Sequence, residues 1–339
     1  GDARVTHDAW VRLGGACDVL GDAAQATSLG RALKPASCIV DALFGTGLTR
    51  EVTGWHAEVI DAMNASGRPI VALDLPSGID ADTGAVLGTA VRAVRTATFA
   101  ARLVGLTTPR GREHAGRVEV GRLGVPDDDA LATTGVAAWG FSAGDVAAWL
   151  SPRRVGVHKH AAGDVLVVAG HTGMTGAAWL AARGALRAGA GLATIASRAT
   201  TTAALAADPG EIMTLAIDPD ALEATLTPAL RRRGAVVLGP GLGTDDGAHA
   251  IVRHVVEHAR CPVVLDADGI QCFAGDPEAL AEHGGRLVLT PHPGELGRLL
   301  ARPTAEIEAD RLGAAGRGAE QRAGLRGREG GGPEVAAPA

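Results

Sequence analysis

Short apolar runs recur along this chain, separated by longer, alanine-rich segments. The runs are five to seven residues long and rich in β-branched residues, which is typical of strands buried on both faces. They are residues 38–43, 69–75, 96–100, 164–169, 192–196, 235–239, 262–266 and 286–290. Segments of helical length lie between many of them, at 54–66, 176–189, 246–259 and 293–301. Strands that alternate with helices predict parallel α/β sheets, and the pattern occurs twice.

The change from the first set of strands to the second falls near residues 124–157. We therefore predict a first domain over 1–125, a linker over 126–155 and a second domain over 156–315. From about Gly316 the sequence is rich in glycine, arginine, glutamate and proline and has almost no apolar periodicity. This composition predicts a disordered tail over 316–339.

Two predicted strands of the first half end in a carboxylate followed by a glycine-containing turn. Asp41 precedes ALFGTG, and Asp74 precedes LPSG. Ligands of open α/β sheets collect outside the carboxyl ends of the strands, where glycines let the backbone come close. A carboxylate there can bind a cation or move a proton. The structural alternative is that these are ordinary βα turns in which the aspartates cap helices.

These motifs give the first half a specific resemblance. DALFGTGL and DLPSGIDADTG resemble the later part of the NAD(P)H-hydrate epimerase domain, over roughly residues 1–125. The resemblance implies a Rossmann-like three-layer fold and interconversion of the R and S epimers of hydrated NADH and NADPH, NADHX and NADPHX. It also implies that Asp41 and Ser77 hold a K⁺ ion and that Asp74 transfers a proton at the substrate. The residues implied to contact the dinucleotide are Gly45, Thr46, Gly47, Leu48, Glu51 and Asp74.

Four further motifs follow in the second half: HKHAAGDVLVVAG, HTGMTGAAWLAARGALRAGAGL, LGPGLGTDD and LTPHPGELGRLL. The second is a glycine-rich turn that opens a helix of small residues including Ala177, and it lacks the lysine of a Walker loop. A helix N-terminus favours an anion. The third motif places Gly241 and Gly243 after a strand, and the fourth places His292 and Glu295 at a helix start. Taken alone, the fourth motif favours the structural alternative, in which Glu295 caps the helix and His292 lies on the surface.

In their order and spacing, the four motifs resemble the ADP/ATP-dependent NAD(P)H-hydrate dehydratase domain, a ribokinase-like α/β fold, over roughly 156–312. The resemblance implies that ADP or ATP phosphorylates the added hydroxyl group of S-NAD(P)HX, and that elimination then regenerates NAD(P)H. Phosphorylation serves the elimination because phosphate leaves more readily than hydroxide. The residues implied to contact the substrate are Ala177, Gly241, Gly243 and His292.

Both resemblances lack a motif at one end. The early NNGGDG loop of the epimerase family, which supplies a K⁺ ligand and phosphate-binding amides, does not occur in this sequence. The GxGD motif of the dehydratase family, which forms an anion hole and carries the catalytic base, does not occur after residue 300. We therefore expect a chain truncated at both ends, with a change of reading frame near Gly316.

Composition narrows the function classes. A net charge of -6 and a pI of about 6.0 argue against a nucleic-acid partner. No stretch approaches the ~18 consecutive apolar residues of a membrane span, and no signal peptide opens the sequence. The four cysteines form no CxxC pair, which favours a reduced, cytoplasmic compartment. The expected partners are the dinucleotide, an adenine nucleotide and further copies of the chain, as a homo-oligomer. Two alternatives stay open: another ribokinase-like small-molecule kinase, and a non-catalytic nucleotide-binding remnant.

Overall fold

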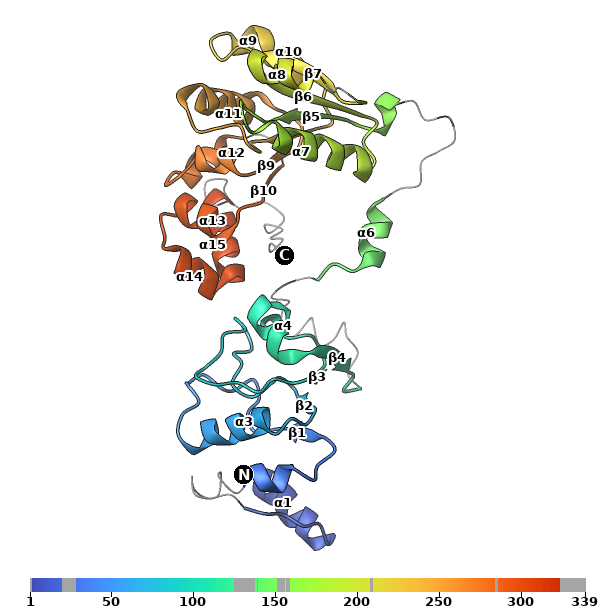
Figure 1. Cartoon of the computed structure of the whole chain (residues 1–339), viewed down its shortest axis with the longest axis vertical. Coiled ribbons are helices and arrows are strands. Elements are labelled where there is room, and N and C mark those ends of the chain that lie inside the picture. The colour runs from blue at the N-terminus through green and yellow to red at the C-terminus, as the bar shows by residue number, and fades with distance from the viewer. Residues whose placement is uncertain are drawn as a thin grey trace. The chain divides into compact units, whose positions relative to one another are not determined.

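The computed structural model describes residues 2–19, 29–124, 138, 140–150, 156, 159–207, 210–283 and 286–323. The chain divides into two compact units, Gly1–Phe141 and Ser142–Ala339 (Figure 1). The division falls inside the segment predicted as a linker, and that segment contains helix α6 (Ala143–Trp149). Each unit is built around its own parallel sheet.

The first unit contains a four-stranded sheet of order β1-β2-β3-β4, all parallel. Helix α3 connects β1 to β2 and helix α4 connects β3 to β4, since parallel neighbours need a crossover. Helix α4 begins after Thr108, whose hydroxyl accepts a hydrogen bond from the Gly111 N–H at 3.2 Å. The elements are α1 (Asp2–Arg12), β1 (Ile39–Asp41), α3 (Trp55–Ala65), β2 (Ile70–Leu73), β3 (Arg95–Phe99), η1 (Val104–Thr107), α4 (Pro109–Ala115) and β4 (Arg117–Gly121).

One face of this sheet is covered by helices, and the described residues leave the other face open. Ile39 packs with α3 on the covered face, and on the same face the Thr96 hydroxyl donates to the last carbonyl of α4 at 2.7 Å. The opposite face carries Val40, Leu73 and Phe99, which are 60%, 38% and 42% exposed. The described part of this unit therefore has two layers where three were predicted, because α3 and α4 lie on the same side.

The second unit contains a six-stranded, all-parallel sheet of order β10-β9-β8-β5-β6-β7. Its elements are η2 (Lys159–Ala162), β5 (Asp164–Val168), α7 (Thr175–Ala188), β6 (Leu192–Arg198), α8 (Ala199–Leu205), β7 (Met213–Ile217), α9 (Leu222–Thr225), α10 (Thr227–Leu230), β8 (Ala235–Leu238), α11 (Asp246–His258), β9 (Val263–Leu265), α12 (Asp268–Gln271), η3 (Pro277–Glu282), β10 (Leu287–Leu289), α13 (Pro293–Leu299), α14 (Thr304–Ala309) and α15 (Arg311–Ala323).

This strand order creates a topological switch point between β5 and β8. From β5 the chain moves outwards through β6 to β7, then returns to β8 on the other side of β5 and continues through β9 to β10. Ligands of open α/β sheets bind outside the carboxyl ends of the strands at such a point. The loops that leave β5 and β8 carry the second and third glycine-containing motifs of the sequence.

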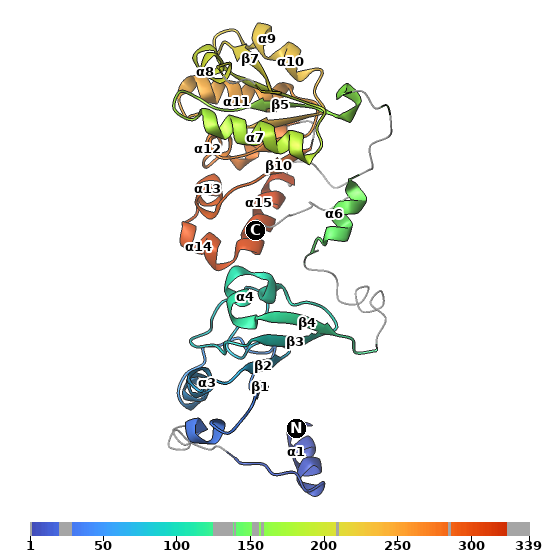
Figure 2. The same cartoon turned by 45° about the vertical axis from the view of Figure 1, so that its right-hand side comes forward.

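The sheet of the second unit is covered on both faces, which gives three layers. Alternate residues of β5 face opposite layers: Val167 packs with Ala178 and Ala182 of α7, and Leu166 belongs to the core shared with Ile251 of α11. Helices α7 and α11 accordingly lie on opposite sides of the sheet (Figure 1 and Figure 2). The prediction of an α/β fold is confirmed, and so are all eight predicted strands.

The two strands that the sequence did not reveal, β4 and β7, each lie at one edge of their sheet. Most of their residues are exposed or half-buried. An edge strand that is solvated along much of its length has no continuous apolar run to mark it.

The predicted disorder of the tail is wrong for residues 316–323, which form the end of α15. Ala314 of this helix is fully buried, and α15 packs against η3 and α13. The composition did not predict this packing, because residues as small as Ala314 and Gly318 lie at the contact and form no apolar pattern. Residues 324–339 lie outside the described part of the chain. Among the described residues, no helix combines the length and apolarity that a bilayer crossing requires.

Candidate functional site

Asp41 and Ser77 form a buried polar cluster beyond the tips of β1 and β2, and each is 1% exposed. The Ser77 hydroxyl donates to Oδ1 of Asp41 at 2.6 Å, and the Ser77 N–H donates to Oδ2 at 2.8 Å. The Leu43 N–H also donates to Oδ1, at 3.3 Å. Within the described residues these hydrogen bonds come from neutral donors alone. A buried carboxylate in such surroundings favours a cation beside it.

Asp74 stands at the tip of β2 in a backbone conformation that non-glycine residues seldom adopt, with φ of 71°. Its N–H donates to the Ala97 carbonyl at 2.7 Å, which ties the strained residue to β3. Its Oδ2 accepts from the Thr46 N–H at 3.3 Å. A Cβ atom added to Gly45 would lie 3.1 Å from the same oxygen, so a glycine lets the turn come close to the carboxylate. Strain of this kind concentrates at functional sites.

One turn joins the two carboxylate motifs. Amides of the turn 43–46 donate to Asp41, Ser77 and Asp74 in succession. Asp41 and Asp74 are 33 positions apart in the sequence. Their side chains nevertheless accept hydrogen bonds from the same turn. The structure thus brings together the residues that the sequence singled out as a K⁺ pair and a proton-transfer group.

The remaining predicted contacts of the first unit lie along the continuation of this turn. Gly47 and Glu51 are exposed. Leu48 packs against the core cluster that includes Ile39. Leu48 therefore anchors the loop, while Gly47 and Glu51 are accessible to a ligand.

In the second unit, the two loops at the switch point are bonded directly to each other. The Gly170 N–H donates to the Pro240 carbonyl at 2.9 Å. Gly239 has φ of 115°, and a Cβ atom there would lie 2.1 Å from the Asp266 carbonyl oxygen. Only glycine allows β8 and the segment after β9 to approach this closely.

Ala177 and Gly241 meet where helix α7 begins. Gly241 has φ of 60°, and an added Cβ atom would lie 3.1 Å from the Cβ atoms of both Ala177 and Met174. Ala177 is the third residue of α7, so its methyl group lies beside the free amides of the helix N-terminus. Small residues on both sides keep these amides close to the second loop.

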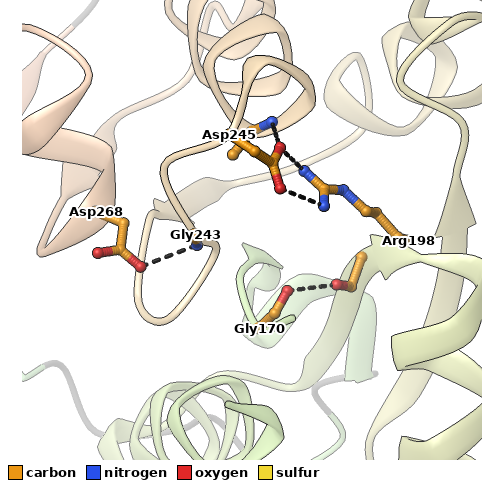
Figure 3. Close-up of polar contacts among 7 residues, drawn as sticks. Gly170, Arg198, Gly243, Asp245 and Asp268 are labelled. Atoms are coloured by element: carbon orange, nitrogen blue, oxygen red, sulfur yellow. Dashed lines mark hydrogen bonds and ion pairs between the residues drawn. The ribbon is translucent and has the colours of Figure 1, made fainter. Parts of the chain in front are cut away.

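Figure 3 shows the polar contacts that hold the loop after β8. The Gly243 N–H donates to Oδ2 of Asp268 at 2.9 Å. Asp245 caps α11 by accepting from the Ala248 N–H at 2.9 Å, and both terminal nitrogens of Arg198 contact its carboxylate, one of them at 2.8 Å. The hydrogen bond from Arg198, with that from the Ala248 amide, lowers the pKa of Asp245 to about 2.

Two buried nitrogen atoms beside this loop make no hydrogen bond within the described residues: Nδ1 of His171 and Nε of Arg198. The His171 ring lies next to Gly243, since a Cβ atom added there would be 3.6 Å from His171 Cδ2. Buried polar atoms are normally paired, so unpaired ones mark positions where a ligand can complete the bonding.

His292 is the N-cap of α13, and hydrogen bonds to the first turn of that helix orient its side chain. Its Nδ1 accepts from the Gly294 N–H at 3.0 Å, and Glu295 accepts from the His292 N–H at 2.9 Å. The His292 side chain is 62% exposed and that of Glu295 is 8% exposed. None of the polar contacts recorded for His292 in the described residues reaches Gly241 or Gly243. The structure thus shows the helix-capping arrangement that was the alternative for this motif, with His292 on the surface. A substrate contact of His292 stays a prediction.

Sequence reasoning did not identify Arg198, Asp266 and Thr290 as parts of the strand-tip network. Arg198 lies at the end of β6, and the Thr290 hydroxyl donates to Oδ1 of Asp266 at 2.7 Å. The signal that could have identified them is a polar residue at the end of an apolar strand. The carboxylate motifs of the first half show the same signal.

Two family models match the chain. Residues 165–325 match the family model described as NAD(P)H-hydrate dehydratase, and residues 3–105 match that of the YjeF-related protein N-terminus. The chain is 38% identical over 319 residues to the bifunctional NAD(P)H-hydrate repair enzyme of Moorella thermoacetica, covering 92% of this chain and 60% of that protein. It is 38% identical over 300 residues to the corresponding Escherichia coli enzyme, covering 88% of this chain and 56% of that protein.

Among solved structures, the ADP/ATP-dependent NAD(P)H-hydrate dehydratase of Bacillus subtilis, co-crystallised with ATP and Mg²⁺, is 29% identical and aligns with a TM-score of 0.44. The alignment covers 56% of this chain and 65% of that one.

The fold and its strand-tip loops define a two-unit parallel α/β protein with candidate ligand sites at the carboxyl ends of its strands. The two family models match successive parts of the chain, residues 3–105 and then 165–325. The chain carries both family models and is similar, over most of its own length, to bifunctional NAD(P)H-hydrate repair enzymes. It spans about 60% of the length of the curated relatives it matches.

Proposed function

We propose that the chain repairs hydrated nicotinamide cofactors, with the first unit epimerising R- and S-NAD(P)HX and the second dehydrating S-NAD(P)HX with ADP or ATP. The observation that carries the proposal is the junction of two glycine-containing loops at the switch point of the second unit. There, the Gly170–Pro240 hydrogen bond and the close approach of Gly241 to Ala177 bring the helix amides beside a glycine-containing loop.

The dehydratase reaction needs a place for an anionic, phosphorylated group. The N-terminus of the 14-residue helix α7 supplies free amides and the positive end of the helix dipole. Transfer of a phosphoryl group to the added hydroxyl converts it into a phosphate ester. Phosphate then leaves with the C–O bond electrons as the neighbouring carbon loses a proton, which restores the dihydronicotinamide ring. In this proposal His171, whose Nδ1 makes no hydrogen bond within the described residues, and Gly243 would contact the dinucleotide beside this helix end.

The epimerase proposal rests on Asp74 and its shared turn. Its carboxylate is half-buried, accepts one backbone N–H and is held by strained backbone, so it can exchange a proton with the substrate hydroxyl. The loop residues Gly45, Thr46, Gly47 and Glu51 are exposed beside it and would bind the dinucleotide.

A K⁺ ion fits the donor set around Asp41. The carboxylate is buried and, among the residues that the structure describes, is bonded only to neutral donors; the Ser77 hydroxyl lies 2.6 Å from it. Hard alkali cations prefer such carboxylate and hydroxyl oxygens. Bound there, K⁺ would offset the buried charge, and Asp41 and Ser77 would hold it beside the turn that contacts Asp74.

One assay tests the proposal and separates it from the alternatives. The chain is incubated with S-NADHX and ATP or ADP, and the near-ultraviolet absorbance of NADH is followed; R-NADHX in a parallel reaction reports epimerisation. We expect NADH to return from S-NADHX only when nucleotide is present. Binding of the nucleotide without turnover would instead show a non-catalytic remnant. Phosphorylation of an unrelated alcohol without NADH formation would show a different ribokinase-like kinase.

We further propose a cytoplasmic location and a homo-oligomeric state. All four cysteines are free thiols, which fits a reducing compartment. Light scattering of the purified chain tests the oligomer, and a monomer at working concentration would contradict it.

A further inference from the structure

A side-chain cluster outside both candidate sites combines two histidines and a glutamate. His254 and His258 lie one turn apart on α11, and Glu223 lies on α9. One potential ligand atom from each residue lies within 4.8 Å of the others. Residues four positions apart share one face of a helix, so the backbone itself holds the two rings together.

The hydrogen bonds of the cluster orient the rings as metal ligands are oriented in proteins. Nδ1 of His258 lies 3.0 Å from the His254 carbonyl oxygen, so it carries the proton and donates, which leaves the lone pair on Nε2. That Nε2 points to Oε1 of Glu223 at 3.2 Å. Nε2 of His254 lies 2.7 Å from the Thr227 hydroxyl. Ligating histidines characteristically use their second ring nitrogen in such a bond.

The spacing also fits a small divalent ion. Zn²⁺ binds nitrogen and oxygen ligands at about 2.0–2.2 Å with tetrahedral geometry, which separates neighbouring ligand atoms by roughly 3.3 Å. The Glu223–His258 pair is already at 3.2 Å, and the three candidate ligand atoms lie within 4.8 Å of one another. The His254 and His258 rings are stacked at 16° from parallel, so one of them must tilt for both lone pairs to meet at one ion. Rotation of the exposed Glu223 side chain can also bring its carboxylate oxygen to ligand spacing from the His254 ring nitrogen.

We propose that Glu223, His254 and His258 bind one divalent transition-metal ion of the Zn²⁺ class, with water in the fourth position. The ion clamps the short helix α9 to α11. The site is separate from the switch-point loops: with a rise of about 1.5 Å per residue, His254 and His258 lie roughly 14 and 20 Å along α11 from Asp245, its N-cap. The bound ion would therefore stabilise the packing of α9 against α11 without taking part in the cofactor chemistry.

Calorimetric titration of the full, untagged chain with ZnCl₂ after chelator treatment tests the site. We expect one saturable Zn²⁺ per chain. His258→Ala should weaken the affinity about 100-fold, and Glu223→Gln at least about tenfold, since even outer-shell changes cost this much. His249→Ala, on the same helix but outside the cluster, should bind as the unaltered chain does. Titration with Co²⁺ should give visible absorption bands of a tetrahedral site, lost in His258→Ala.

Thermal unfolding supplies the second readout. At one fixed Zn²⁺ concentration, the unfolding midpoint of the unaltered chain and of His249→Ala should rise by the same amount, and that of Glu223→Gln, a surface change that leaves the core intact, should rise less. Absence of saturable binding would overturn the proposal. So would Zn²⁺ binding of unchanged affinity in both Glu223→Gln and His258→Ala, because the ion would then lie elsewhere.

Discussion

Replacement of Gly239 by alanine tests whether the strand tips of the second unit approach as closely as the structure shows. A non-glycine residue at φ of 115° costs about 1–3 kcal/mol. The new methyl group would also lie 2.1 Å from the Asp266 carbonyl oxygen and 2.5 Å from the Gly269 nitrogen. Both are backbone atoms, so the tips of β8 and β9 must separate, at a further cost of about 1–3 kcal/mol. We expect Gly239→Ala to destabilise the second unit by about 2–6 kcal/mol.

Gly275→Ala is the matched control, because Gly275 has φ of 73° and no atom within 4 Å of an added Cβ. This change carries only the conformational cost of about 1–2 kcal/mol. Urea unfolding, followed by circular dichroism, compares the two variants through their midpoints and slopes. If Gly239→Ala unfolds at the same urea concentration as Gly275→Ala, the close approach at the switch point is wrong.

Three further outcomes follow from the described contacts. Ser77→Ala leaves the buried Asp41 without its hydroxyl donor and should destabilise the first unit by about 1–3 kcal/mol in urea unfolding. KCl should stabilise the unaltered chain more than NaCl does, and this difference should shrink in Ser77→Ala; an equal effect of both salts on the unaltered chain would contradict K⁺ binding. Because the folded pKa of Asp245 is about 2, its pairing with Arg198 stabilises above the unfolded value of 3.8 and is lost as pH falls towards 2. Asp245→Asn, which keeps the helix cap, should therefore lower stability by about 1 kcal/mol or less at pH 7 and by nothing at pH 2; a loss that persists at pH 2 would argue against the ion pair. Burial raises the pKa of the Cys272 thiol to about 11, so iodoacetamide at pH 8 should modify it far more slowly than the exposed thiols, and equal rates by mass spectrometry would show that it is not buried.

Much of the fold was predictable because the central strands are buried on both faces and carry continuous apolar runs. The edge strands β4 and β7 were not predictable by that signal, since much of their length is solvated. The carboxylate motifs were predictable because Asp41 and Asp74 end their strands in the same way. The Arg198–Asp245 pair joins residues 47 positions apart and depends on the sheet order, which no local pattern encodes.

For His292, the sequence did not predict the interactions of the side chain. The spacing of His292, Pro293 and Glu295 permits both a helix cap and a ligand contact, and the hydrogen bonds in the structure satisfy the first. Local sequence therefore predicted the position of this residue but not the partner of its side chain. A third layer over the first sheet was also expected, and the described helices do not supply it.

Hydrogen–deuterium exchange of the chain with and without S-NADHX most directly tests the claim that the switch-point loops bind the cofactor. The account predicts that S-NADHX slows amide exchange in both loops, 170–174 and 239–243, and at the start of α7, while α14 stays unchanged. Protection confined to other segments, or none at saturating S-NADHX, would contradict it.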